Sequence, residues 1–102
     1  MTPLIAVVGD DAQIRRVVAG YLQQEGFQVL TALDGPSGLA LIQREQPTLV
    51  ILDIMLPGMD GLEVMRHLRA SGNPTVAAVY VVLLTARVEE TDRVLGLEKQ
   101  KP

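Results

Sequence analysis

Short runs of apolar residues alternate along the chain with segments in which apolar residues recur at helical spacing. The runs are rich in Val, Ile and Leu and short enough to be buried strands. They cover residues 4–8, 27–33, 48–52 and 79–84. After the first run, apolar residues from Ile14 to Leu22 follow the i, i+3, i+4, i+7 spacing that gives a helix one apolar face. The pattern therefore predicts strands separated by helices.

Turn and capping residues mark where these elements begin and end. Gly26 ends the first helix, the residues 34–37 (Asp-Gly-Pro-Ser) begin the second, and Pro47 closes it. Further helices are predicted over 61–68 and 89–97. Strands and helices thus alternate as β-α-β-α-β-α-β-α, which is typical of an α/β fold with an open parallel sheet and helices on both faces.

Composition narrows the class of protein. The 102 residues predict one domain, 1–102, with no output domain attached. Hydrophobic residues make up 48% of the chain and aromatic residues only 3%, so the core is expected to be aliphatic. A formal net charge of −3 argues against direct nucleic-acid binding, and the absence of cysteine excludes disulfides and thiolate metal sites. With no apolar run that could span a bilayer and no signal peptide, we expect a cytoplasmic protein without a membrane anchor.

Polar residues directly follow three of the predicted strands. Gly9, Asp10 and Asp11 come after the first, Asp53 after the third and Thr85 after the fourth. Open α/β sheets bind ligands outside the carboxyl ends of their strands, so these residues are expected to meet at one edge. Capping of a helix or loop is the alternative for each carboxylate, and for Asp11 it is the favoured interpretation.

As a set, the carboxylates indicate a bound cation. Like charges gathered in one cleft raise the energy unless a proton or cation offsets them. Carboxylate oxygens suit a hard divalent ion, most simply Mg²⁺. A carboxylate beside such an ion can attack a phosphoryl group and form an aspartyl phosphate, and the Thr85 hydroxyl could donate to a phosphoryl oxygen.

Three segments also carry a resemblance to a known family. They are Val7–Asp11, Leu52–Gly61, which reads LDIMLPGMDG, and Leu83–Ala86. From about residue 4 to residue 97 the chain resembles the receiver domain of two-component response regulators, and Leu52–Gly61 is the most specific of the three segments. The resemblance implies a doubly wound, flavodoxin-like sheet with strand order 2-1-3-4-5.

The resemblance further implies site roles. A sensor histidine kinase or phosphotransfer protein would pass a phosphoryl group to Asp53, which would also be a metal ligand. Asp10 matches the second acidic position at the metal, and the backbone carbonyl of Met55 matches the third metal contact. Thr85 matches the family's switch hydroxyl. Such a domain is a signalling switch with a changeable partner-binding surface and not a metabolic enzyme.

Two departures from the family pattern concern the site. Gly9 stands where the family has the first of two acids, so Mg²⁺ binding is expected to be weaker, with Asp11 as a partial substitute. Lys101–Pro102 resembles the family's lysine–proline pair, but we expect the fifth strand before it to be missing, and most or all of the fifth βα unit with it. A helix over 89–97 carries the chain about 13 Å from the active edge. The residues from Leu97 to Lys101 extend over a similar length, so Lys101 reaches an Asp53 phosphate only if that helix is shorter.

Two further features are the connection before the fourth strand and a pair of arginines. Residues 71–78 make a longer connection than the family's usual one and are expected to form a surface loop. The pair Arg15–Arg16 lies on the polar side of the first predicted helix, where solvation is the simpler interpretation and contact with a kinase helix the alternative.

Other functions and an assembly state follow from the same features. A degenerate receiver that binds partners independently of phosphorylation is the main alternative, and a haloacid dehalogenase-like phosphatase is a remote one, because Met55 stands where that class has its second aspartate. Without a fifth strand, residues 79–84 become an uncharged sheet edge. Such edges template association, so homodimers or edge-strand pairing are expected.

Overall fold

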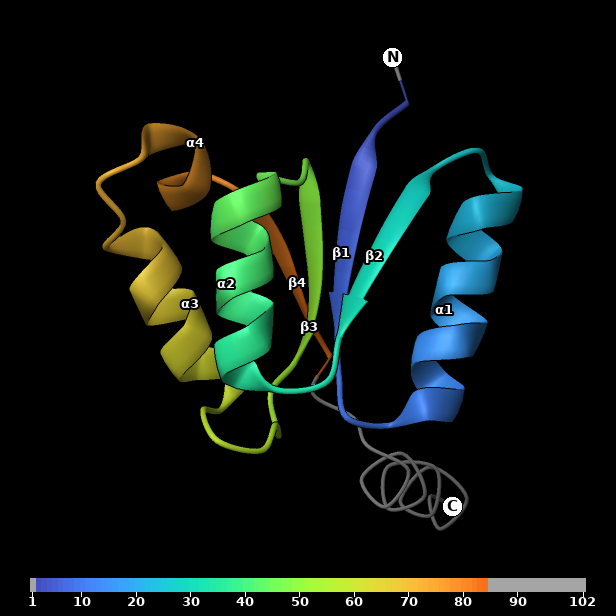
Figure 1. Ribbon diagram of the computed structural model, residues 1–102, viewed down its shortest axis with the longest axis horizontal. Helices are drawn as coiled ribbons and strands as arrows, with labels where there is room; N and C mark the ends of the chain where they lie inside the picture. Colours follow the sequence, from blue (N-terminus) through green and yellow to red (C-terminus); the bar gives the residue numbers. More distant parts are fainter. Residues whose placement is uncertain (1, 85–102) are drawn as a thin grey trace, which may run out of the picture.

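The computed structural model describes residues 2–84, which form a parallel four-stranded sheet and its covering helices (Figure 1). The predicted strands and helices of this range are present with ends shifted by a few residues. The elements are β1 (Leu4–Val8), α1 (Ala12–Gln24), β2 (Gln28–Ala32), α2 (Gly35–Glu45), β3 (Leu49–Asp53), α3 (Gly61–Arg69), α4 (Pro74–Ala77) and β4 (Tyr80–Leu84). The predicted helix over 89–97 and the predicted absence of a fifth strand concern residues outside this range.

The strands lie in the order β2-β1-β3-β4, which confirms the first four positions expected for a doubly wound sheet. The chain steps from β1 to β2 in one direction, then crosses back over β1 to β3 and on to β4. Because crossovers between parallel strands are right-handed, this reversal places α1 on one face of the sheet and α2 and α3 on the other (Figure 1).

The main core lies on the face covered by α2, α3 and α4. Side chains alternate between faces along a strand, so Val8, Val50 and Leu52 point to this side together. They pack against apolar side chains of the three helices, namely Leu41, Ile42, Val64, Leu68 and Val76. On the opposite face α1 contacts β1 and β2, but none of its residues is fully buried.

Carboxylates begin the helices as the sequence predicts. Asp11 Oδ1 accepts hydrogen bonds from the backbone nitrogens of Gln13 (2.9 Å) and Ile14 (3.1 Å), so Asp11 is the N-cap of α1. Asp34 caps α2 in the same way, with Pro36 in the first turn. These caps satisfy backbone donors that have no partner inside the helix.

The connection before β4 differs from the loop predicted for residues 71–78. It contains the one-turn helix α4, which Asn73 caps through its bond to the Thr75 nitrogen (2.9 Å). Val76, within this helix, is buried. Arg69 from α3 donates to the carbonyl oxygens of Ala77 (2.9 Å) and Val79 (2.7 Å). The extra residues thus form contacts with α3, although Gly72, Pro74, Thr75 and Ala78 stay exposed.

None of the helices in residues 2–84 is both long enough and apolar enough to cross a membrane.

Candidate functional site

Asp10 and Asp53 lie where the direction of strand addition reverses. β1 and β3 are neighbours, with Val8 beside Leu52 in the register, and the chain leaves them toward opposite edges of the sheet. Ligands of open α/β sheets bind at this switch point, outside the carboxyl ends of the strands. Asp53 is the last residue of β3, and Asp10 follows β1 after Gly9. The fold therefore brings both predicted carboxylates to the edge where a ligand is expected.

Asp53 is the one buried charged residue of the described range, with 7% of its surface exposed. Its Oδ1 accepts a hydrogen bond from the backbone nitrogen of Met55 at 3.1 Å. The loop after β3 thus folds back on the carboxylate that ends the strand. Burying a carboxylate costs free energy, which the hydrogen bond from Met55 partly offsets.

Gly9 leaves space beside this carboxylate. A Cβ placed on Gly9 would lie 3.7 Å from Asp53 Cβ and 4.0 Å from Asp53 Oδ2, which is ordinary van der Waals contact. Gly9 is not among the residues with positive φ. A Cβ therefore fits here, so contacts at the β carbon do not require glycine at this position.

The loop from Ile54 to Asp60 is held in place by backbone contacts. The Gly61 nitrogen donates to the Ile54 oxygen at 2.6 Å, and the Gly35 nitrogen donates to the Pro57 oxygen at 3.3 Å. A Cβ on Gly35 would come within 2.6 Å of Met59 Cβ, so only glycine lets α2 approach the loop this closely. The two glycines fix the strand-to-helix connection that carries Met55.

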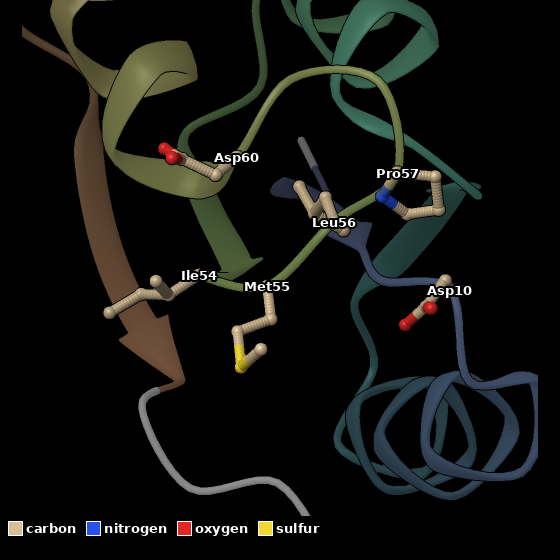
Figure 2. A pocket seen from close by; sticks show the side chains of 6 residues that line it. All are labelled: Asp10, Ile54, Met55, Leu56, Pro57 and Asp60. Atoms are coloured by element: carbon tan, nitrogen blue, oxygen red, sulfur yellow. The ribbon is translucent and has the colours of Figure 1, made fainter.

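An open pocket of about 400 Å³ lies between this loop and the segment after β1 (Figure 2). Its lining consists of Asp10, Ile54, Met55, Leu56, Pro57 and Asp60. Asp10 is on one side of the pocket and Met55 on the other (Figure 2). Asp60 Oδ1 accepts from the Glu63 nitrogen at 2.9 Å, so its carboxylate caps α3. Asp11 likewise caps α1.

The donor chemistry of this edge suits a hard cation. Asp10 and Asp53 supply carboxylate oxygens, and Met55 has a backbone carbonyl in the same loop. Mg²⁺ uses one or two carboxylates and keeps several waters, so this small set of oxygen donors fits it. Within residues 2–84 no group of three or more His, Cys, Asp or Glu side chains is placed to hold a metal. The weaker Mg²⁺ binding expected from Gly9 stays a prediction.

Thr85 and Lys101 lie outside the described residues. The described part also contains contacts that the sequence pattern did not indicate. The guanidinium of Arg15 donates from Nη1 to the Gly9 oxygen at 2.6 Å, so Arg15 is not simply a solvated residue. The spacing of Arg15 from Gly9 gives no signal of this bond, because the turn between β1 and α1 determines it.

The sequence profile of the response regulator receiver domain matches residues 5–100. The chain belongs to this family, which confirms the resemblance carried by its motifs. Receiver domains are signalling switches of two-component systems, and the haloacid dehalogenase-like alternative has no support from this match.

One relative is the transcriptional regulatory protein AfsQ1 of Streptomyces coelicolor, which is 40% identical over 96 residues. The match covers 94% of this chain but only 40% of AfsQ1, so this chain spans well under half of that protein. The transcriptional role in its name describes the whole relative.

Solved structures agree with the fold. A response regulator receiver protein from Methanoculleus marisnigri has a TM-score of 0.77 at 31% identity, covering 91% of this chain and 76% of its own. The receiver domain of the sensor histidine kinase PA1611 from Pseudomonas aeruginosa has a TM-score of 0.79 at 26% identity, covering 92% and 75%. In that structure a magnesium ion is coordinated in the active-site cleft.

Proposed function

We propose that this receiver domain accepts a phosphoryl group on Asp53. The observation that carries the proposal is the position of a buried carboxylate at the end of β3, next to β1 and at the switch point of the sheet. The proposed donor is the phosphohistidine of a sensor histidine kinase or of a phosphotransfer protein. The domain, residues 1–102, would work in the cytoplasm.

In the proposed step a carboxylate oxygen of Asp53 attacks the phosphorus of the phosphohistidine. The new O–P bond forms as the P–N bond breaks, and the leaving imidazole takes up a proton. The product is an acyl phosphate on Asp53. The bond from Met55 N to Asp53 Oδ1 holds one carboxylate oxygen, which orients the other for attack.

The proposed cation is Mg²⁺, held by Asp10, Asp53 and the backbone carbonyl of Met55. When bound, it would offset the repulsion between the carboxylate and the incoming phosphate. Asp11 is assigned to the α1 cap and not to the metal, because its Oδ1 already accepts two backbone donors. Two roles remain predictions: a hydrogen bond from the Thr85 hydroxyl to the phosphate, and a contact between Lys101 and the phosphate.

A receiver that acts independently of phosphorylation is the second candidate, and Gly9 is the observation that favours it. A family site with one acid fewer has less negative charge to hold the cation. The two candidates share the fold and differ in whether Asp53 reacts.

Incubation with acetyl phosphate and Mg²⁺, followed by intact-mass measurement, separates them. We expect one added phosphoryl group on the wild-type chain and none on Asp53→Asn. Asp60→Asn is the matched control, since Asp60 lines the pocket beside Asp10 and asparagine still caps α3, and it should be labelled. Label retained on Asp53→Asn would show that another residue is the acceptor. A folded wild-type chain that stays unlabelled would favour the second candidate.

A further inference from the structure

Arg15 joins α1 to the end of β1 through a single hydrogen bond. Its Nη1 donates to the Gly9 oxygen at 2.6 Å, and the side chain is partly buried. The acceptor is the backbone carbonyl directly before Asp10. A charged donor makes such a bond stronger than a neutral one, and its short length agrees with this.

Further hydrogen bonds hold Gly9 and Asp11, the two neighbours of Asp10. The Gly9 nitrogen donates to the Ala32 oxygen at 3.0 Å, which continues the β1–β2 pairing. The Asp11 side chain caps α1, and the Asp11 oxygen accepts from the Arg15 nitrogen at 3.0 Å. Asp10 is therefore an exposed residue between two anchored neighbours, and Arg15 contacts both of them.

Glycine makes this restraint more important. Without a Cβ, Gly9 has more backbone freedom than any other residue type, and that freedom would be passed directly to the orientation of Asp10. Arg15 fixes the Gly9 carbonyl and so limits rotation about the bonds that precede Asp10.

We infer that Arg15 is a positioning residue that fixes the Gly9 carbonyl and thereby directs the Asp10 carboxylate toward the cation site. The inference rests on the proposed function, because it requires Asp10 to be a metal ligand. It concerns Arg15, to which the family resemblance assigns no metal contact.

The sign of the effect distinguishes positioning from charge. If Arg15 acted only as a nearby positive charge, replacing it by glutamine would remove a repulsion and tighten cation binding. A positioning role predicts weaker cation binding instead, because an Asp10 carboxylate with a less defined orientation is a poorer ligand. Loss of residues that orient metal ligands typically weakens binding 10–100-fold, and we expect about tenfold for this indirect restraint.

The test is titration of the full chain with Mn²⁺, which prefers the same oxygen donors, followed by electron paramagnetic resonance of the free ion. Arg15→Gln should weaken Mn²⁺ binding about tenfold at a salt concentration where the chain is folded by circular dichroism. Arg16→Gln is the matched control, with the same charge change one residue further along α1 on an exposed residue, and should leave the affinity near the wild-type value.

Two rescue variants address the possibility of a general folding defect. Arg15→Lys keeps one donor for the one carbonyl and should recover part of the affinity. Gly9→Ala restrains the same backbone, and a Cβ there meets no steric conflict. In the Arg15→Gln background it should recover part of the Mn²⁺ affinity.

Arg15→Gln with unchanged or tighter Mn²⁺ binding, or an equal loss in Arg16→Gln, would overturn the positioning role while leaving the metal site intact. Wild-type binding that is absent, or unaffected by Asp10→Asn, would instead refute the metal site of the proposed function, and the positioning role with it.

Discussion

Gly61, the first residue of α3, lies directly against the backbone of Asp53. A Cβ on Gly61 would collide with the Asp53 carbonyl oxygen and come within 2.8 Å of Ile54 Cα. The Gly61 nitrogen donates to the Ile54 oxygen at 2.6 Å. The first turn of α3 and the end of β3 are therefore too close to leave room for a side chain at Gly61, and the position of Asp53 depends on its absence.

Gly61→Ala should consequently lower the free energy of unfolding by about 1–3 kcal/mol, the usual effect of overpacking a buried site. It should also reduce labelling of Asp53 by acetyl phosphate, because the collision falls on the acceptor's own carbonyl. Urea denaturation and intact-mass measurement provide the two readouts. Gly72→Ala is the control, since nothing lies within 4 Å of a Cβ there. Equal stability of the two variants would contradict the close approach.

Gly9→Asp should strengthen cation binding. The new Cβ has only ordinary contacts with Asp53, so the backbone does not have to shift to accept it. It adds negative charge at the site, and we expect roughly tenfold tighter Mg²⁺ binding by calorimetry.

Gly9→Asn is the isosteric control for this change. It should leave Mg²⁺ affinity close to that of the wild type, because an amide adds no charge. If Gly9→Asp binds Mg²⁺ no better than Gly9→Asn, either the added carboxylate does not face the metal or no metal site exists.

Much of the fold could be predicted because the strands are short and mostly apolar, and helices with one apolar face separate them. The positions of Asp10 and Asp53 followed from the same pattern, since residues after parallel strands share an edge. α4 could not be predicted, because it is only four residues long and its buried Val76 reads as part of the apolar run leading to β4. The Arg15 bond ends on a backbone carbonyl, which no side-chain pattern reveals.

Asp34 should titrate below its ordinary value. The hydroxyl and the backbone nitrogen of Ser37 donate to Asp34 Oδ1 at 2.7 and 2.8 Å, and they hold the pKa of that carboxyl below 3.8. Since the folded state favours the charged form, this cap adds stability above the unfolded pKa and loses it as pH falls through the lowered pKa.

Ser37→Ala should therefore move the pKa of Asp34 back toward 3.8, as measured by carbon NMR of the carboxyl group, and make acid unfolding less steep. Ser37→Thr retains the hydroxyl and should keep the pKa low. An unchanged pKa in Ser37→Ala would mean that the hydroxyl contributes little in solution.

Lysine substitutions on β4 should separate packing from association. Val81 packs against the core, whereas Val82 is 48% exposed on the opposite face and Tyr80 is 79% exposed. Val81→Lys should lower the free energy of unfolding by roughly 1–3 kcal/mol, because it buries a charged group without a partner. Val82→Lys should leave stability nearly unchanged.

Within residues 2–84, β4 pairs with β3 alone, and we expect self-association along it. Sedimentation velocity over a concentration series should show less association for Val82→Lys than for the wild type. A wild-type chain that stays monomeric at high concentration would rule out the association, and a Val82→Lys variant that associates equally would place it elsewhere.

The central position of β3 has a consequence for the timescales of the site. β3 is paired on both sides, with β1 and β4, so amide hydrogens near Asp53 should exchange with solvent only through openings that approach global unfolding. Asp10 is itself exposed and lies beyond the paired residues of β1, so a smaller opening suffices there. The two carboxylates thus belong to parts of the domain with different opening free energies. Asp53, the proposed acceptor, lies in the part that opens more slowly, so a phosphoryl group on it would be carried by the more stable strand.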